Sequence, residues 1–272
     1  MNANVSEITT ERGLVKRISL GSVGSTNDYA INFLRTENTD KETIVVAESQ
    51  EKGKGQRGKP WISAPGRDLC MSWILKTPPQ PPAVFNMAAA LGVLDGLRKI
   101  TGNTDISIKW PNDIIVVHNN VPKKISGLLI ENIWRGDVWA AAIVGIGVNV
   151  GKESDPKHRP QFKLPATSIF DLISKHMSPA SLEVVILNAL QHRVNNLRHT
   201  GGIQNTVSAF NSELFGIHSE RVYTVNETNH TGVLKKVEED GRAVFSWSKN
   251  NTRNNIQNPE THLHSSEVIW SW

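Results

Sequence analysis

Four β-rich runs follow one another between residues 106 and 150, and they constrain the fold of this chain more than any other feature. The runs read ISIKW, DIIVV, KKISGLLIENIW and VWAAAIVGIGVNV. Their residue types are those enriched in strands, and Arg135-Gly136-Asp137 predicts a turn between the last two. We therefore expect a large β-sheet at the centre of the protein.

Helices are predicted on both sides of these strands in the sequence. Apolar residues recur at helical spacing through AVFNMAAALGVLDGLRKI, which follows Pro81-Pro82, and through SLEVVILNALQHRVNNL at 181–197. A short helix is expected over YAINFLRT, capped by one of the four residues Ser25, Thr26, Asn27 and Asp28. Further strands are predicted at 14–20, 42–49 and 68–77, whereas the polar segment before residue 14 is expected to be a frayed lead-in.

The pattern changes near residue 217 to short strands, with Asp240-Gly241 as a two-residue turn between two of them. The sequence therefore predicts an α+β protein in two parts. The first, residues 1–215, is a mixed β-sheet with flanking helices. The second, residues 216–272, is a small C-terminal β-barrel.

Composition narrows the classes of protein to consider. The 272 residues suffice to bury a core, and no apolar run approaches the roughly 18 residues of a membrane span. The single Cys70, within the apolar run DLCMSWIL, excludes an internal disulfide and is interpreted as a buried structural thiol in a reducing cytoplasm. A formal net charge of +4 favours phosphorylated or acidic ligands, but the scattered basic residues do not indicate nucleic-acid binding.

The segment GKGQRGKPW, residues 53–61, has the glycine and lysine spacing of a nucleotide-binding P-loop. Pro60 occupies the position where that motif needs a hydroxyl group, and Pro65-Gly66 follows too soon for a helix. The P-loop interpretation therefore fails. Glycines at 53, 55 and 58 still allow backbone N–H groups to face an anion, although a solvated basic hairpin tip is an equally plausible interpretation.

The segment KWPND, residues 109–113, predicts a break between two strands. Pro111 has no N–H group to donate and restricts Trp110 to extended geometry. Asn112 and Asp113 then lie at the break, where an amide can bind an adenine edge and a carboxylate can hold Mg²⁺. A plain Asx turn fits this pair of residues equally well.

Five further positions are unusual in the runs that follow. Lys124 opens the mostly apolar run KISGLLIE, where a lysine is costly unless an anion pairs with it; exposure at the strand end is the alternative. Gly127 permits a ligand or another chain segment to approach closely. In GIGVNV, Gly145 and Gly147 either thin the strand beside a ligand or mark a bulge, and Asn149 either binds polar ligand atoms or begins a turn.

Taken in order, these segments resemble the biotin protein ligases. GSTN (24–27) is followed by Q-x-x-G-x-G-x-x-G-x-x-W (50–61), KWPND, K-[IL]-x-G-[IL]-L and G-[IAV]-G-x-N, an order that is specific although each motif alone is weak. The match covers residues 20–150 closely. The C-terminal part is similar, more loosely, to the small SH3-like barrel of that family.

The resemblance implies an enzyme that joins biotin to ATP, forms biotinyl-5′-AMP and passes the biotinyl group to a lysine of a biotin carboxyl carrier protein. It implies ATP and biotin as substrates, Mg²⁺ on the phosphates with Asp113 as its ligand, and Lys124, Asp113 and Arg57 as catalytic residues. Asp113 would also accept the proton of the carrier lysine. The implied biotin-binding residues are Ser25, Thr26, Asn27, Gln50, Gly53, Lys54, Gly55, Gln56, Trp61, Lys124 and Gly127. The implied ATP-binding residues are Lys54, Arg57, Lys109, Asn112, Asp113, Lys124 and Asn149.

The basic loop departs from the usual G-R-G-R of the family. Lys54 stands where an arginine is usual and keeps its charge but not its bidentate fork, and Gln56 replaces a second arginine without a charge. We expect the adenylate to be held less tightly as a result.

Other functions remain as alternatives. A lipoate-type ligase is the nearest enzymatic rival, and a biotin-responsive DNA-binding regulator is not expected because only 24 residues precede Ser25. The carrier of acetyl-CoA carboxylase is the expected partner, with the carrier of another biotin-dependent carboxylase such as pyruvate carboxylase as the alternative, and a homodimer through exposed sheet edges is possible. Neither DNA nor membrane is an expected partner.

Overall fold

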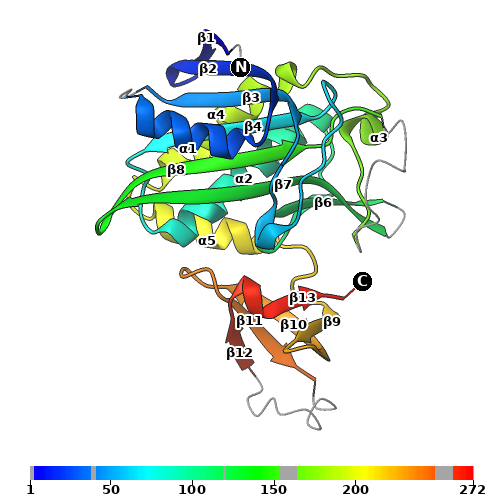
Figure 1. Cartoon of the computed structure of the whole chain (residues 1–272). Coiled ribbons are helices and arrows are strands. Elements are labelled where there is room, and N and C mark those ends of the chain that lie inside the picture. Colours follow the sequence, from blue (N-terminus) through cyan, green and yellow to red (C-terminus); the bar gives the residue numbers. More distant parts are fainter. Residues whose placement is uncertain (1–2, 38–40, 119–120, 153–163, 249–259, 272) are drawn as a thin grey trace.

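The computed structural model describes residues 3–37, 41–118, 121–152, 164–248 and 260–271. These residues form two β-sheets and a set of helices (Figure 1). The larger sheet has eight strands in the order β1-β2-β3-β4-β8-β7-β6-β5. Its strands are β1 (Asn4–Thr10), β2 (Gly13–Val23), β3 (Thr43–Gln50), β4 (Leu69–Lys76), β5 (Ile106–Lys109), β6 (Asp113–His118), β7 (Val121–Arg135) and β8 (Val138–Val148).

Helices cover both faces of the larger sheet. The long helices α2 (Pro82–Thr101) and α4 (Ala180–Asn196) pack against each other and, with α5 (Gly202–Ser212), share one large core cluster with the sheet. The helix α1 (Thr26–Thr36) packs on the opposite face over a second, smaller cluster (Figure 1). Because both of its faces are covered, β4 is buried at almost every position. A short helix, α3 (Ile169–Ile173), follows β8.

The predicted mixed sheet is confirmed. The strand β2 pairs in parallel with β3, and the other neighbours in the sheet are antiparallel. The turn at 135–137 joins β7 to β8, and Gly136 takes a positive φ of 58° there. Of the four candidate caps, Ser25 begins α1, since its side chain accepts a hydrogen bond from the Asp28 N–H.

The expectation of a frayed N-terminus was wrong. Residues Asn4–Thr10 form β1, which pairs antiparallel with β2 along the edge of the sheet. Six of its seven side chains are exposed or half-buried, so the hydrophobic pattern that identifies a strand is weak there. The backbone hydrogen bonds between β1 and β2 hold the strand instead. A tight turn joins the two strands, and Gly13 at its end takes a φ of 118°.

The second sheet has five strands in the order β12-β11-β10-β9-β13. Its bounds are β9 (Glu220–Val225), β10 (Thr228–Val237), β11 (Ala243–Trp247), β12 (Glu260–Leu263) and β13 (Val268–Trp270). Within the described strands, β12 and β13 are the two edges, and no pairing between them closes the sheet into a barrel. The division of the chain at 215/216 stays a prediction.

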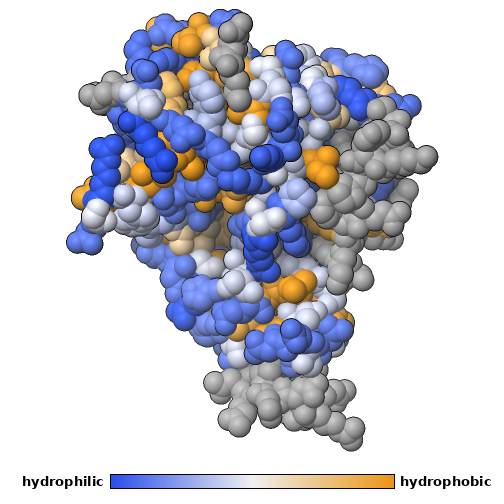
Figure 2. All heavy atoms as spheres, viewed as in Figure 1, coloured by the Kyte–Doolittle hydropathy of each residue, from blue (hydrophilic) through white to orange (hydrophobic). Residues whose placement is uncertain are grey.

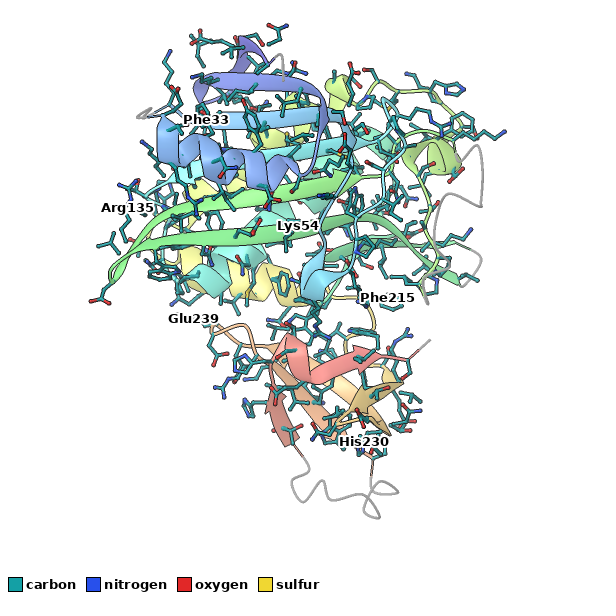
Figure 3. The ribbon with its side chains drawn as sticks, viewed as in Figure 1. Phe33, Lys54, Arg135, Phe215, His230 and Glu239 are labelled. Carbon is teal, nitrogen blue, oxygen red and sulfur yellow. The ribbon has the colours of Figure 1, made fainter. Side chains whose placement is uncertain are left out.

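The two sheets meet through aromatic side chains. Figure 3 labels Phe215 at the junction, and the centroid of its ring lies 5.9 Å from that of Trp270. The guanidinium group of Arg221 lies 4.4 Å from the centroid of the Phe215 ring. Trp110 and Phe245 make a further edge contact at 6.4 Å between ring centroids. Aromatic contacts of this kind bury large areas and hold the smaller sheet against the end of the larger one.

The hydrophilic surface and the single buried thiol are those expected from the composition. The face seen in Figure 2 is mostly hydrophilic, with small scattered apolar areas. Cys70 is a free, buried thiol, as predicted, and burial raises its pKa. No helix in the described part of the chain combines the length and the apolar character needed to cross a membrane.

Candidate functional site

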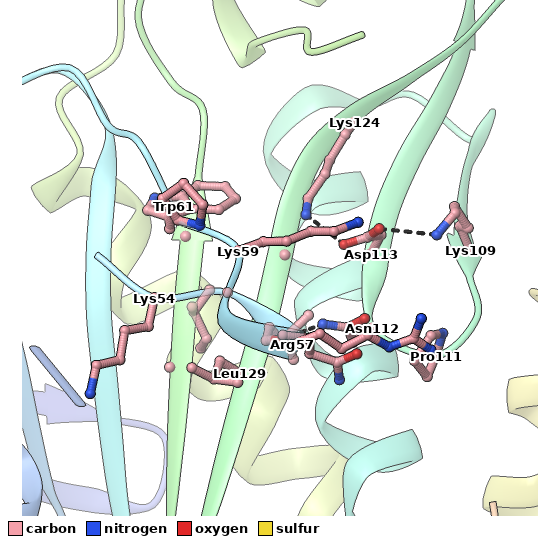
Figure 4. A pocket seen from close by; sticks show the side chains of 18 of the residues that line it. Lys54, Arg57, Lys59, Trp61, Lys109, Pro111, Asn112, Asp113, Lys124 and Leu129 are labelled. Carbon is pink, nitrogen blue, oxygen red and sulfur yellow. Dashed lines mark hydrogen bonds and ion pairs between the residues drawn. The ribbon is translucent and has the colours of Figure 1, made fainter. Parts of the chain in front are cut away.

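A cavity of about 510 Å³ opens between the loop after β3 and the ends of β5 to β8 (Figure 4). Its lining includes residues from all of the predicted motifs, which are separated by up to about 120 residues in the sequence. Of the predicted site residues, the following line it: Ser25, Thr26, Asn27, Gln50, Lys54, Gly55, Gln56, Arg57, Trp61, Lys109, Asn112, Asp113, Lys124, Gly127 and Asn149. Gly53 does not line the cavity.

The floor of the cavity consists of glycines on two neighbouring strands. Gly127 of β7 pairs directly with Gly147 of β8, and Gly145 lies two residues along. A Cβ atom on Gly127 would lie 2.8 Å from Nζ of Lys124, and one on Gly147 would overlap the ring of Trp61. On Gly145 it would overlap Oδ1 of Asn27. Each glycine therefore makes room for one side chain that lies flat on the sheet.

One end of the cavity is cationic. The Asp113 carboxylate, at the first residue of β6, pairs through Oδ1 with Lys124 at 2.5 Å and through Oδ2 with Lys109 at 3.2 Å. Lys59 extends from the basic loop toward the same carboxylate (Figure 4). Arg57, at the tip of the loop, also lines the cavity. Several positive groups therefore surround a partly buried negative charge.

Burial and charge act in opposite directions on these groups. Burial is the largest influence on Asp113 and would raise its pKa, but Lys124 and Lys109 together outweigh it and hold that pKa below its ordinary value. Burial lowers the pKa of Lys109, and the charge of Asp113 offsets this only in part. Asp113 is therefore ionised at neutral pH and is a weak base, which argues against the predicted role as proton acceptor.

At the other end of the cavity, the side chains contributed by Gln50 and by Ser25, Thr26 and Asn27 are polar and uncharged. The Gln50 side-chain oxygen accepts hydrogen bonds from the Thr26 N–H at 2.8 Å and from its hydroxyl group at 3.1 Å. The Asn27 amide nitrogen donates to the Leu129 carbonyl and to Glu131, at 3.1 and 2.7 Å. These contacts fix the GSTN segment against β7, and Ser25 lines the same end.

The basic loop is a closed hairpin. The Trp61 N–H donates to the Gly53 carbonyl at 2.9 Å, and the Gly55 N–H donates to the Lys59 carbonyl at 2.7 Å. No α-helix follows Lys59, as predicted, and the loop contains a single 3₁₀ turn, η1 (Gln56–Gly58). Arg57 takes a left-handed φ of 57° at the tip, which is uncommon for a residue with a side chain.

Several predicted residues have other partners in this arrangement. Lys54 turns away from the cationic end and pairs with Asp28 at 2.6 Å (Figure 4). The Gly55 N–H group is used inside the loop and so cannot also face a phosphate group. The Asn149 amide nitrogen donates to the Lys124 and Thr167 carbonyls at 3.2 and 2.9 Å, so both of its hydrogens hold neighbouring backbone in place.

Sequence reasoning missed part of the lining. Lys59 was not assigned to the site, although it lines the cavity beside Lys109. The smaller sheet also contributes lining residues, among them Trp270, whose ring lies 5.6 Å from the ammonium group of Lys109. No motif signals this contact, because it depends on how the two sheets pack.

The close approach of Trp61 to Gly147 gives a first prediction. Replacing Gly147 by alanine forces the Trp61 ring or the β8 backbone to move, and we expect the free energy of unfolding to fall by about 1–3 kcal/mol. Urea denaturation measures this change. Gly21→Ala is the matched control, because a Cβ atom there meets nothing within 4 Å and φ is ordinary. Equal stability of the two variants would contradict the packing described here.

Known proteins resemble this chain in both sequence and fold. Residues 20–149 match the model of the biotin/lipoate A/B protein ligase family. This segment is a domain of that family. The bifunctional ligase/repressor BirA of Bacillus spizizenii is 31% identical over 208 residues, which are 75% of this chain and 62% of that protein. A biotin–[acetyl-CoA-carboxylase] ligase of Paracoccus denitrificans is 31% identical over 44% of this chain and 54% of its own length.

The fold matches as well. The biotin protein ligase of Aquifex aeolicus, solved with biotin and ATP, has a TM-score of 0.72 over 94% of this chain and 98% of its own, at 24% identity. The family domain contains the basic loop, KWPND, Lys124 and the glycine floor. The chain spans about three-fifths of the length of the Bacillus relative, so the activity of the whole protein is a matter for proposal.

Magnesium fits poorly as a direct ligand of Asp113 in this arrangement. Both carboxylate oxygens already pair with ammonium groups, which would repel a divalent cation. Across the described residues, no group of three or more His, Cys, Asp or Glu side chains is placed to hold a metal ion. The predicted Mg²⁺ site at Asp113 therefore stays a prediction that the arrangement does not favour.

Proposed function

We propose that the chain activates biotin with ATP to give biotinyl-5′-AMP and then transfers the biotinyl group to a lysine of a biotin carboxyl carrier domain. The observation that carries this proposal is the division of the cavity into two ends. A polar, uncharged end suits the ureido head group of biotin, and a cationic end suits the triphosphate. The relatives whose names describe biotin ligases support the same activity.

In the first step, a carboxylate oxygen of biotin attacks the α-phosphorus of ATP, and the bond to pyrophosphate breaks. Two negatively charged reactants must approach each other, and the charge on the phosphate oxygens grows in the transition state. Lys124 lies against Gly127 of the glycine floor, at the cationic end of the cavity, where its ammonium group can offset that charge. Lys109 and Arg57 would act on the remaining phosphate groups.

Asp113 would hold the two ammonium groups in place rather than react itself. Its ion pairs hold the side chains of Lys124 and Lys109 in fixed orientations in a partly buried site. A metal ion would come with the nucleotide and help to neutralise its phosphates, with these lysines supplying the protein's share of positive charge.

In the second step, the carrier lysine attacks the biotinyl carbonyl carbon and AMP leaves with its bonding electrons. The lysine must lose a proton, and the low pKa of Asp113 makes that residue a poor acceptor, so the leaving phosphate or solvent takes it. The hairpin of residues 53–61, with Trp61 lying on Gly147, would cover the adenylate and keep water from its mixed anhydride bond.

The basic loop suggests how firmly the adenylate is held. Lys54 pairs with Asp28, and Gln56 carries no charge, so Arg57 and Lys59 supply the loop's positive charge within the cavity. We expect Gln56→Arg to slow the release of biotinyl-5′-AMP by about five- to tenfold, because a charge-assisted hydrogen bond to phosphate is added. Stopped-flow measurement of adenylate dissociation would test this. Equal dissociation rates for the wild type and Gln56→Arg would contradict the expected role of charge at position 56.

A purified carrier domain tests the whole proposal. Incubation with the protein, biotin and Mg-ATP is expected to give one biotinylated lysine per carrier domain, detected by intact-mass spectrometry. Substituting arginine for the carrier lysine is the control. Labelling with lipoate in place of biotin would assign the chain to the lipoate-type ligases. The SH3-like barrel and the homodimer stay predictions.

A further inference from the structure

The tip of the hairpin of residues 53–61 is fixed by few contacts with the rest of the protein. Every residue from 54 to 60 is exposed or half-buried. The backbone hydrogen bonds at the tip close on the hairpin itself, since the Gly55 N–H donates to the Lys59 carbonyl and the Lys59 N–H donates to the Gln56 carbonyl. Neither burial nor backbone pairing therefore determines where the tip lies over the cavity.

One ion pair joins the tip to a neighbouring helix. Nζ of Lys54 donates to Oδ1 of Asp28 at 2.6 Å, and Asp28 lies in the first turn of α1. Among the described residues, this is the one hydrogen bond or ion pair between a side chain of residues 54–59 and a residue outside the hairpin. The hydrogen bond to Asp28 raises the pKa of Lys54, and the charge of Glu131 adds to that effect.

The pair either competes with the nucleotide for Lys54 or holds the hairpin closed, and these two roles have opposite consequences. Figure 4 shows Lys54 pointing away from the cationic end of the cavity. If its ammonium group moved to a phosphate, it would give up Asp28 and Glu131, both of which favour its charge in the present position. Arg57 and Lys59 already supply the hairpin's positive charge within the cavity. The geometry therefore favours the second role.

We propose that Asp28 is a positioning residue that holds Lys54, and through it the hairpin of residues 53–61, over the occupied cavity, so that biotinyl-5′-AMP is retained until a carrier lysine arrives. This inference rests on the proposed function and extends it to the retention of the intermediate. The side chains of Lys54 and Asp28 are 48% and 43% exposed, so the pair is a weak tether. A weak tether suits a hairpin that must open in every reaction cycle.

The test uses variants of the full chain at both ends of the pair. Asp28→Asn removes the negative charge and keeps the shape of the side chain, whereas Asp28→Glu keeps the charge. Lys54→Gln removes the positive charge, and the variant with both Asp28→Asn and Lys54→Gln completes a double-mutant cycle. Glu7→Gln is the matched control, because Glu7 makes a similarly exposed pair with Lys41 at 2.8 Å and does not line the cavity.

Two measurements report on the hairpin. With biotin and Mg-ATP, rapid quench measures the formation of biotinyl-5′-AMP, and a chase with unlabelled adenylate measures its dissociation. Without substrates, an arginine-specific protease cuts after Arg57 at the exposed tip, and intact-mass spectrometry follows that cut. The rate of cleavage reports how often the tip leaves its place. Thermal melting shows whether each variant is folded.

For Asp28→Asn we expect dissociation of the adenylate and cleavage after Arg57 to become about two- to fivefold faster. The rate of adenylate formation should stay within about twofold of wild type, because the pair does not touch the reacting atoms. Asp28→Glu is expected to recover part of the change. Lys54→Gln should match Asp28→Asn, and the double variant should add nothing further, because either substitution breaks the same pair. A general disturbance of α1 would instead slow adenylate formation.

Several results would overturn the role of Asp28 alone. Slower adenylate dissociation in Asp28→Asn would show that the pair competes with the nucleotide instead. Unchanged dissociation would show that the pair does not retain the adenylate, and an equal effect of Glu7→Gln would show that the site of the substitution does not matter. If Asp28→Asn does not fold, Lys54→Gln decides in the same way.

Failure of the proposed function is a separate result. A wild type that forms no adenylate from biotin and Mg-ATP would overturn the proposed function and the retention of the intermediate with it. The cleavage rates after Arg57 need no substrate, so they would still decide whether Asp28 holds the hairpin. Equal cleavage of wild type and Asp28→Asn would overturn that contact's role.

Discussion

Replacing Lys124 by alanine is expected to lower the rate of biotin-dependent pyrophosphate release by about 10²–10³-fold. Lys124 lies against Gly127 at the cationic end of the cavity, with its ammonium group 5.4 Å from the centroid of the Trp61 ring. In the proposed reaction, its ammonium group would offset charge on the biotin carboxylate and on the α-phosphate. Single-turnover release with saturating substrates isolates this chemical step from binding.

Lys123→Ala is the matched control for Lys124. The two lysines are neighbours on β7, so a general weakening of the strand would affect both variants. Lys123 does not line the cavity, and its variant is expected to react at the wild-type rate. If Lys124→Ala kept more than about a tenth of the wild-type rate, the transition-state role argued for it would be wrong.

Asp113→Asn is expected to lower the free energy of unfolding by about 3–5 kcal/mol near neutral pH. The substitution keeps the shape of the side chain and removes the negative charge that Lys124 and Lys109 share. Two partly buried ammonium groups would then face each other with no anion between them. The expected loss of stability is large because Asp113 is the carboxylate that pairs with both ammonium groups.

The pH dependence of this variant follows from Lys109. Burial lowers the pKa of Lys109, and Asp113 opposes that shift, so the substitution lowers the pKa further. As pH rises through this lowered value, the folded variant has fewer bound protons than the unfolded chain, and folding becomes more favourable. The stability deficit of Asp113→Asn should therefore shrink as the pH rises from neutral toward the ordinary pKa of lysine.

Urea denaturation at several pH values measures both effects. Asp240→Asn is the control, because Asp240 makes an exposed pair with Arg242 whose contribution to stability is small. A deficit that stays constant from neutral to alkaline pH would show that Asp113 does not hold the charge of Lys109. Nearly equal stability of the two variants at neutral pH would contradict the shared ion pair itself.

Much of the larger sheet could be predicted from the sequence because its signals are local. The β-rich runs at 106–150 and the apolar periodicity after Pro82 became β5 to β8 and α2. Pro111 marked the break between β5 and β6 that places Asp113 at the start of a strand. In contrast, β1 has little apolar pattern and β12 lies among polar residues, so neither was predicted.

The sequence could predict which residues line the site, but it could not predict which residues they contact. Ordered motifs identified nearly every cavity residue in the first part of the chain, yet they could not show that Lys54 pairs with Asp28 or that Asn149 holds backbone. Such partners depend on the three-dimensional packing of segments distant in sequence. The same is true of Trp270, which reaches Lys109 from the smaller sheet.

The most direct test of the proposed function is pyrophosphate release from Mg-ATP by the purified protein, with biotin, with lipoate or with neither acid. We predict biotin-dependent release of about one equivalent that becomes catalytic when a carrier domain is added, because the adenylate stays bound until a lysine accepts the biotinyl group. Release with lipoate alone would contradict biotin as the substrate. No acid-dependent release would contradict the adenylation chemistry altogether.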